Sequence, residues 1–69
     1  MLAVVKIGDN LRRWRTRRAL TQAQLAENAG LGPNTIPRIE RNEVEPHMTT
    51  VRKLADTLQV DPAELIGDA

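Results

Sequence analysis

A chain of 69 residues with a net charge of +1 is long enough for one small domain, and too short to enclose a deep catalytic pocket as well as a core. It has no cysteine and one histidine, which excludes disulfides and thiolate metal sites and argues against a zinc site. Trp14 is its one aromatic residue, which argues against RNA-binding modules that stack bases, and no apolar run approaches the roughly 20 residues of a membrane span.

Apolar residues at helical spacing predict a first helix over residues 7–18. Its inward stripe consists of three apolar residues and ends at an arginine: Ile7, Leu11, Trp14 and Arg18. Three other arginines fall well off this stripe and should be exposed: Arg12, Arg13 and Arg17. Arg15 falls at the edge of the stripe, so we expect its side chain to be half covered.

A second helix is predicted to begin at Thr21, because Thr21 and Gln24 have the spacing of a capping box, in which each side chain bonds the other residue's backbone N–H. The inner face of this helix is expected to consist of small and apolar residues: Leu25, Ala26 and Ala29. Gly30 supplies the left-handed residue that ends the helix.

A third helix is predicted to open after Gly32, with Pro33 in its first turn, and to close at Asn42 in a left-handed conformation. Its inner face is expected to consist of two isoleucines: Ile36 and Ile39. Pro37 is expected to bend or distort this helix. With Gly32 as the cap, the N–H that Pro37 lacks would have bonded to the carbonyl of Pro33.

A fourth helix is predicted over residues 48–58, with one apolar face: Met48, Val51, Leu54, Ala55 and Leu58. The fifth is expected to be one or two turns long, because Asp61 and Pro62 are the residue types of a helix cap and a first helical position. Two residues of this element should pack onto the core: Leu65 and Ile66. Gly67 ends it.

Together these elements predict an all-α fold, a compact bundle of five short helices in one domain over residues 7–66, with tails at residues 1–6 and 67–69. Segment 21–39 has the pattern of a helix-turn-helix, since one short helix ends at Gly30 and the next starts three residues later. Ala26 is small enough to permit close approach of these helices. Leu31 and Ile36 are apolar and are expected to fill the angle between them.

Charge divides the chain into two parts. Residues 1–42 contain eight Lys or Arg and three Asp or Glu, whereas residues 43–69 contain two Lys or Arg and six Asp or Glu. A basic part joined to an acidic part suggests one surface aimed at a polyanion and another aimed away from it. An ordinary solvated basic helix would give the same composition.

Residues 7–66 resemble the lambda-repressor-like, Cro-type helix-turn-helix family, also called the XRE family. The matching motifs occur in the family's order and spacing: LRRWRTRRAL, LTQAQLAENAGL, TIPRIERN, a turn at Glu45-Pro46, and TVRKLADTLQVDPAEL. The resemblance implies that the third helix enters the major groove of double-stranded DNA.

In that family the first, second and sixth residues of the third helix face the bases, and these are Pro33, Asn34 and Arg38 here. The resemblance implies that Asn34 bonds adenine and Arg38 bonds guanine, whereas Pro33 offers only apolar contact, as with a thymine methyl. Pro37 also lies near the groove, where the family often has a polar residue. The alternative for Asn34 and Arg38 is a plain solvent-exposed helix residue.

The resemblance further implies phosphate contacts by four residues: Gln22, Thr35, Arg41 and Asn42. Gln22 matches the first residue of the family's second helix, which fixes a phosphate or the outermost base. The alternative for Gln22 is a plain solvent-facing helix residue. Arg41 and Asn42 match the loop after the third helix. Glu43 and Glu45 depart from the family here, because further basic residues are common at these positions, and this leaves the strength of the phosphate clamp open.

Arg15 and Glu40 match a family pair in which an arginine of the first helix meets a glutamate at the end of the third. A bidentate bridge between them would hold the recognition helix on the rest of the domain, so we interpret the pair as structural. No catalytic residue is expected, because Glu40 is committed to Arg15 and a hydrolase would need a nucleophile–base pair or a dense carboxylate site. No metal and no cofactor are expected.

What the resemblance implies is sequence-specific binding of double-stranded DNA by a small transcriptional regulator, expected to be a cytoplasmic, nucleoid-associated repressor that acts as a homodimer on a palindromic operator. Four candidates for dimer contacts are Met48, Leu65, Ile66 and the tail Met1–Val5. The alternatives with the same fold are an antitoxin or other interaction module, with a protein partner such as a toxin, and a restriction–modification controller protein. An exposed apolar patch on the acidic part, away from Arg38, would favour an interaction module.

Overall fold

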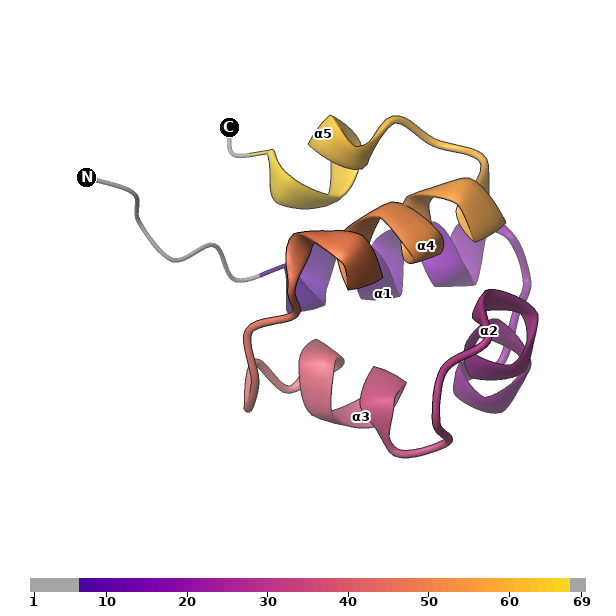
Figure 1. The fold of residues 1–69 in the computed structure, drawn as a ribbon. Helices are drawn as coiled ribbons and strands as arrows, with labels where there is room; N and C mark the ends of the chain where they lie inside the picture. Colours follow the sequence, from indigo (N-terminus) through magenta and orange to yellow (C-terminus); the bar gives the residue numbers. More distant parts are fainter. Residues whose placement is uncertain (1–6, 68–69) are drawn as a thin grey trace.

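The computed structural model describes residues 7–67, which form five α-helices and no strand (Figure 1). The helices are α1 (Gly8–Arg17), α2 (Gln22–Ala29), α3 (Thr35–Glu40), α4 (Met48–Leu58) and α5 (Pro62–Ile66). The predicted all-α bundle of five short helices is confirmed. Of the two expected tails, residues 1–6 and 68–69 lie outside the described residues.

The described part of the chain shows neither a membrane-spanning helix nor a metal-binding cluster. None of its helices has the length and apolar character required to cross a membrane. Within residues 7–67, no group of three or more His, Cys, Asp or Glu side chains is placed to hold a metal ion.

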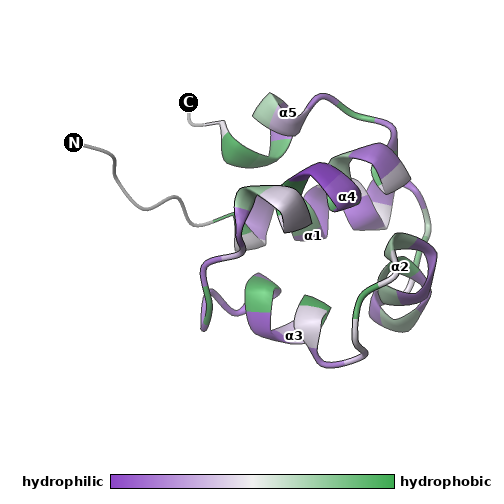
Figure 2. Cartoon of the chain, viewed as in Figure 1, coloured by the Kyte–Doolittle hydropathy of each residue, from purple (hydrophilic) through white to green (hydrophobic). Residues whose placement is uncertain are grey.

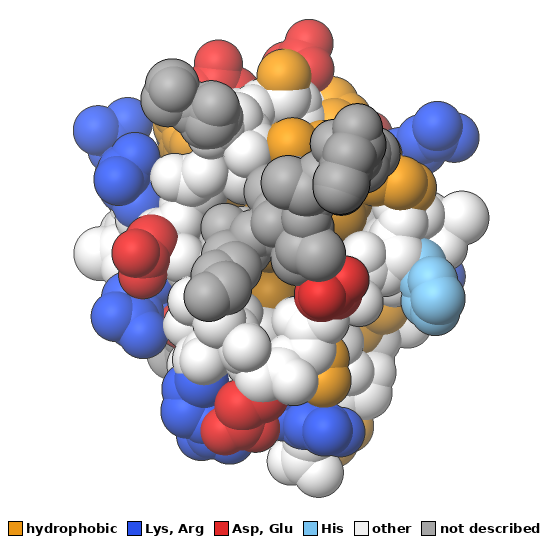
Figure 3. All heavy atoms as spheres, turned by 90° about the vertical axis from the view of Figure 1, so that its left-hand side faces the viewer, with side chains coloured by type: hydrophobic (Ala, Val, Ile, Leu, Met, Phe, Trp, Pro, Cys, Tyr) orange, Lys and Arg blue, Asp and Glu red, His pale blue; other side chains and the backbone are white. Residues whose placement is uncertain are grey.

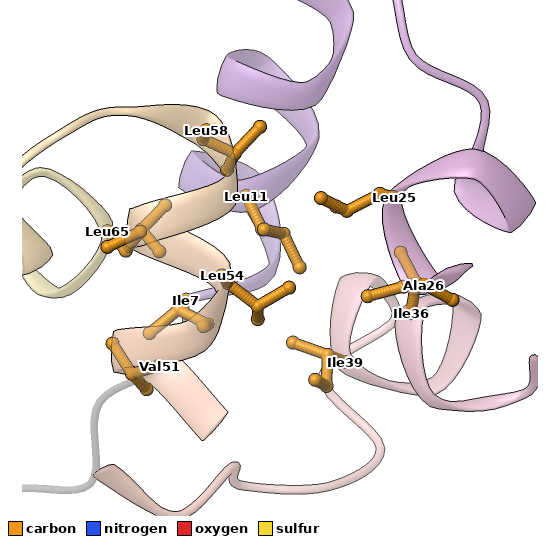
Figure 4. Close-up of a cluster of buried hydrophobic side chains, with 11 residues drawn as sticks. Ile7, Leu11, Leu25, Ala26, Ile36, Ile39, Val51, Leu54, Leu58 and Leu65 are labelled. Carbon is orange, nitrogen blue, oxygen red and sulfur yellow. The ribbon is translucent and has the colours of Figure 1, made fainter. Parts of the chain in front are cut away.

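One hydrophobic core joins the helices (Figure 4). α4 packs against α2 and α5, α1 packs against α3 and α5, and α2 packs against α3. Each helix carries both hydrophobic and hydrophilic residues, as expected of amphipathic helices around a shared core (Figure 2). The buried apolar residues among those described are Ile7, Leu11, Leu25, Ala26, Ile36, Ile39, Val51, Leu54, Ala55, Leu58 and Leu65.

α2 begins and ends as the sequence predicts. The Thr21 hydroxyl accepts a hydrogen bond from the Gln24 backbone N–H at 3.0 Å, and the Gln24 side chain accepts one from the Thr21 N–H at 2.9 Å. Gly30 follows the helix in the left-handed conformation, with φ of 72°. The Leu31 N–H then donates to the Ala26 carbonyl at 2.8 Å, which fixes the direction in which the chain leaves α2.

α3 begins two residues later than predicted. Pro33 and Asn34 form a turn rather than the first helical residues, and Asn34 is the N-cap of a helix that starts at Thr35. The physical reason is Pro37. It is now the third residue of the helix, where an N–H would have no acceptor within the helix, so the bond that we expected Pro37 to disrupt is never required. The first bond of α3 is donated by the Arg38 N–H to the Asn34 carbonyl, at 3.4 Å.

The bounds of α1, α4 and α5 agree with the predictions to within one residue. Met48 is an exception to the predicted inner face of α4, because it is 60% exposed. The first buried residue of that face is Val51, so α4 starts about one turn before it reaches the core. The Asn10 side chain donates to the Leu65 carbonyl at 2.8 Å and ties α1 to the end of α5.

Candidate nucleic-acid interface

A buried carboxylate joins the first three helices. Glu40, at the end of α3, is 2% exposed and is the one charged residue buried within residues 7–67. Arg15 of α1 meets it bidentately, with Nε 2.6 Å from one carboxylate oxygen and Nη2 3.1 Å from the other. Gln22 of α2 donates to Glu40 Oε1 through Nε2 at 3.0 Å, and Arg12 Nε lies 3.6 Å from the same oxygen. Side chains of α1 and α2 therefore converge on the last residue of α3.

The Glu40 carboxyl is ionised although it is buried. Burial opposes the charged form and is the largest influence on the Glu40 pKa, but the hydrogen bonds from Arg15 and Gln22 and the charges of Arg15 and Arg12 outweigh it, so the pKa lies below its usual range. The hydrogen bond to Glu40 raises the pKa of Arg15 against the opposing effect of its own burial. Both partners are charged at neutral pH, which makes the bridge a charge-assisted one.

The hydrogen bond from Gln22 to Glu40 was missed by the sequence reasoning. The family resemblance assigns Gln22 a contact to DNA. In the structure, one of its amide N–H groups donates a hydrogen bond to Glu40. The amide still has a second N–H and an acceptor oxygen, so a contact to DNA is compatible with this bond and would be oriented by it. No local spacing could have found the contact, because it depends on how α2 crosses α3.

The outer side of the helix-turn-helix carries the residues predicted to read bases. Pro33, Asn34 and Arg38 are exposed, with 56% of the Arg38 side chain in solvent, whereas Pro37 is half-buried. Asn34 is the N-cap of α3, but its side chain makes no capping hydrogen bond to any described residue. The isoleucines of α3 are buried on its other side, so the core holds this face outward.

The loop after α3 holds an ion pair that the family pattern did not suggest. Arg41 Nε and Nη2 lie 2.7 and 3.3 Å from the two carboxylate oxygens of Glu43, and Arg38 Nε lies 3.9 Å from one of them. The hydrogen bond from Arg41, with the charges of Arg41 and Arg38, holds the pKa of Glu43 below its usual range, and the same bond raises the pKa of Arg41. The departure from the family at Glu43 thus acts directly on two predicted DNA contacts.

The two other predicted phosphate contacts have different surroundings. Asn42 is exposed and left-handed, with φ of 59°, as predicted for the residue after α3. Its side-chain Oδ1 accepts a hydrogen bond from the Gly8 backbone N–H at 3.2 Å, which connects the start of α1 to the end of α3. Thr35 is half-buried at the first position of α3.

Besides Arg15, four arginines lie in α1 or directly after it. The three predicted to be exposed are exposed: Arg12, Arg13 and Arg17. The guanidinium carbons of Arg17 and Arg18 lie 5.0 and 5.1 Å from the centroid of the Trp14 ring, within the range of a cation–π contact. Arg18 also donates through Nε to the Leu58 carbonyl at 2.8 Å, at the end of α4. Arg17 and Arg18 therefore take part in packing as well as in surface charge.

A helix-turn-helix family model matches residues 11–65 of this chain. Over 61 residues the chain is 37% identical to the cryptic phage CTXphi transcriptional repressor RstR of Vibrio cholerae. This match covers 88% of this chain and 55% of that protein. The chain spans about half the length of the curated relatives that it matches.

Two solved structures carry the same fold. The restriction–modification controller protein C.AhdI from Aeromonas hydrophila superposes with a TM-score of 0.84 at 35% identity, over 90% of each chain. The P22 c2 repressor, solved in complex with a synthetic operator, superposes with a TM-score of 0.81 at 30% identity, over 87% of this chain and 91% of that one. This chain belongs to the lambda-repressor-like, Cro-type (XRE) helix-turn-helix family.

Proposed function

We propose that this chain binds a specific sequence of double-stranded DNA by placing α3 in the major groove, and that it acts as a small transcriptional regulator. The observation that carries the proposal is that Asn34 and Arg38 are exposed along a helix whose other side is fixed by buried isoleucines and by the Glu40 carboxylate. Readout of bases requires side chains that are exposed and a backbone that is held in place. α3 meets both requirements.

Direct base readout would come from the two polar residues. An asparagine amide bonds N6 and N7 of adenine, and a guanidinium bonds O6 and N7 of guanine, each with about 1–3 kcal/mol of discrimination against the wrong base. Asn34 and Arg38 fill these roles. Pro33 and Pro37 have no donor, so their contacts are apolar, as with a thymine methyl.

Contacts to the DNA backbone would fix the register of α3 without reading sequence. Gln22 stands at the first position of α2, where backbone N–H groups without helical partners favour a phosphate. Thr35 and Arg41 stand at the two ends of α3. We assign the phosphate contacts to four residues: Gln22, Thr35, Arg41 and Asn42.

We further propose that the chain acts as a homodimer and represses transcription from a palindromic operator. A single copy presents two polar base-reading residues, which is too few to define a unique site. Two copies would place their α3 helices one helical turn of DNA apart, about 34 Å. The similar protein RstR is a transcriptional repressor, and the P22 c2 repressor was solved with its operator, which supports this form of the proposal.

The dimer contact would involve apolar residues on the surface of α4 and α5. Met48 is 60% exposed and Ile66 is half-buried, so both remain candidates. The prediction of Leu65 as a third dimer contact was wrong, because its side chain is fully buried in the core. The tail Met1–Val5, the fourth, lies outside the described residues.

Selection of bound duplexes from a random DNA library at near-physiological salt tests the proposal. Enrichment of a palindrome with half-sites about 10 bp apart supports a dimeric, sequence-specific regulator. Weak, salt-sensitive binding without enrichment of any sequence contradicts it. The same selection with Arg38→Ala should lose its preference at one base pair per half-site, which identifies the base that Arg38 reads.

A second candidate function is a protein-interaction module, such as an antitoxin or an adaptor. It is favoured by the exposed Met48, which stands in the acidic part of the chain on α4. Sedimentation of the isolated chain separates the candidates. A dimer that Met48→Glu converts to a folded monomer supports self-association, whereas a monomeric chain that selects no DNA sequence supports a module that needs another protein. A controller protein, the name given to C.AhdI, would be a form of the regulator.

A further inference from the structure

The loop after α3 places one carboxylate against the cations at the end of that helix. After the left-handed Asn42, Glu43 donates its backbone N–H to the Arg38 carbonyl at 2.9 Å. Its carboxylate accepts two hydrogen bonds from Arg41, at 2.7 and 3.3 Å, and lies 3.9 Å from Arg38 Nε. At the bottom of Figure 3, where α3 and the following loop lie, an acidic side chain stands between basic ones. The backbone bond fixes where Glu43 stands, so the pairing does not depend on side-chain conformation alone.

A carboxylate in this position has the features by which a guanidinium recognises a phosphate. Two oxygens share a negative charge and match the parallel N–H groups of the arginine fork. Arg41 and Arg38 are the residues to which we assign a phosphate contact and a base contact. Each must therefore leave Glu43, or divide its N–H groups between Glu43 and DNA, when it binds DNA.

We infer that the Glu43 carboxylate competes with DNA for Arg41 and Arg38, and that it lowers the affinity of the chain for DNA of every sequence. The inference rests on the proposed DNA-binding function. When Arg41 moves to a phosphate, the Glu43 carboxylate is left beside the DNA backbone, which repels it and leads it to take up a cation. Each phosphate contact releases about 0.9 cations from duplex DNA, so this uptake cancels about one contact in the salt dependence of binding.

The chain offers a matched control for this inference. Glu43→Gln removes one negative charge and keeps the shape of the side chain. Glu45→Gln removes the same charge two residues further on, at an exposed position that forms no ion pair with any described residue. Both variants have the same net charge, so a difference between them isolates the pairing with arginine from the overall field of the protein.

The experiment measures fluorescence anisotropy of a labelled duplex of random sequence with the full chain and both variants, at salt from about 50 to about 200 mM. E43Q should bind about fourfold to tenfold tighter than the unchanged chain at the low end, and this gain should shrink by about fourfold at the high end, because its salt slope is steeper by about one. E45Q should change affinity by less than about twofold, with an unchanged slope. Thermal unfolding of each variant checks that the fold is retained.

A double-mutant cycle with Arg41→Gln locates the competition. In the R41Q background, the gain from E43Q should shrink toward the gain from E45Q. A gain of full size in that background overturns competition at Arg41, and equal effects of E43Q and E45Q in the unchanged chain overturn the inference as a whole. If the selection enriches no sequence and none of these proteins binds the duplex, the proposed function fails and takes this inference with it, so the two failures are distinguishable.

Discussion

Gly8, at the start of α1, lies against the backbone of Glu40, at the end of α3. A Cβ added to Gly8 would stand 2.6 Å from the Glu40 carbonyl oxygen and 2.8 Å from that of Ile39. Side-chain carbons do not approach backbone oxygens so closely, so a glycine is required for the two helices to meet. The same residue donates its N–H to Asn42, and the start of α1 therefore fixes the point at which the proposed recognition helix ends.

Gly8→Ala should destabilise the fold by about 1–3 kcal/mol, because the added methyl group forces α1 and α3 apart. The free energy of unfolding in urea measures this cost. Gly32→Ala is the matched control, since a Cβ there meets only the Thr35 hydroxyl at an ordinary 3.6 Å and the backbone is not left-handed. Equal midpoints for the two variants would show that the contact at Gly8 adapts without strain.

Glu40→Gln should cost about 2–4 kcal/mol of unfolding free energy, because it leaves the Arg15 guanidinium without its charged partner. The Arg15 side chain is 16% exposed to solvent, so the loss of stability should lie toward the lower end of the range for buried ion pairs. The double variant Arg15→Met with Glu40→Leu removes both charges and should be much less destabilising. A single variant that is as stable as the double one contradicts a role for the bridge in holding α3.

Acid should weaken the fold through Glu40. Burial opposes its ionisation, but Arg15, Gln22 and Arg12 outweigh burial and hold its pKa low in the folded chain, whereas its pKa in the unfolded chain is about 4.3. Below that value the unfolded chain binds more protons, so the stability due to this carboxyl is complete above about pH 4.3 and is lost as the pH falls through the folded pKa. The unfolding free energies of the unchanged chain and E40Q should therefore converge in acid. A difference that does not vary with pH would contradict this.

Arg38→Ala should weaken binding to the selected operator by about 1–3 kcal/mol and remove discrimination at one base pair. The control is Arg52→Ala, which removes the same charge from an exposed position on α4. Titration of both variants on the operator and on its single-base substitutions measures the difference. If Arg38→Ala weakens binding equally on all sequences, Arg38 contacts phosphate rather than a base.

Features that depend on neighbours in sequence were predictable. The capping box of Thr21 and Gln24, the stop at Gly30 and the left-handed Asn42 each involve residues a few positions apart, so the residue types determine them. The base-facing positions of α3 came instead from the family resemblance, which names Pro33, Asn34 and Arg38.

Features that depend on how helices cross were not predictable. The bond from Gln22 to Glu40 and the approach of Gly8 to the end of α3 join residues that are 18 and 32 positions apart. The predicted start of α3 was wrong for another reason, because two prolines were each suited to the first turn of the helix. The sequence reasoning placed Pro33 at the first position, whereas the structure places Pro37 within the first turn. Met48 was misjudged because periodicity does not indicate where the core ends.

The late start of α3 has a thermodynamic consequence. The helix has six residues, Pro37 has no N–H to give, and hydrogen bonding within the helix begins only at Arg38. So short a helix does not persist alone, and its shape is imposed by the core and by Glu40. Amide hydrogen exchange in α3 should therefore require opening of the whole domain. DNA that binds α3 would select the folded chain by mass action, so operator affinity and the melting temperature are two readings of one equilibrium.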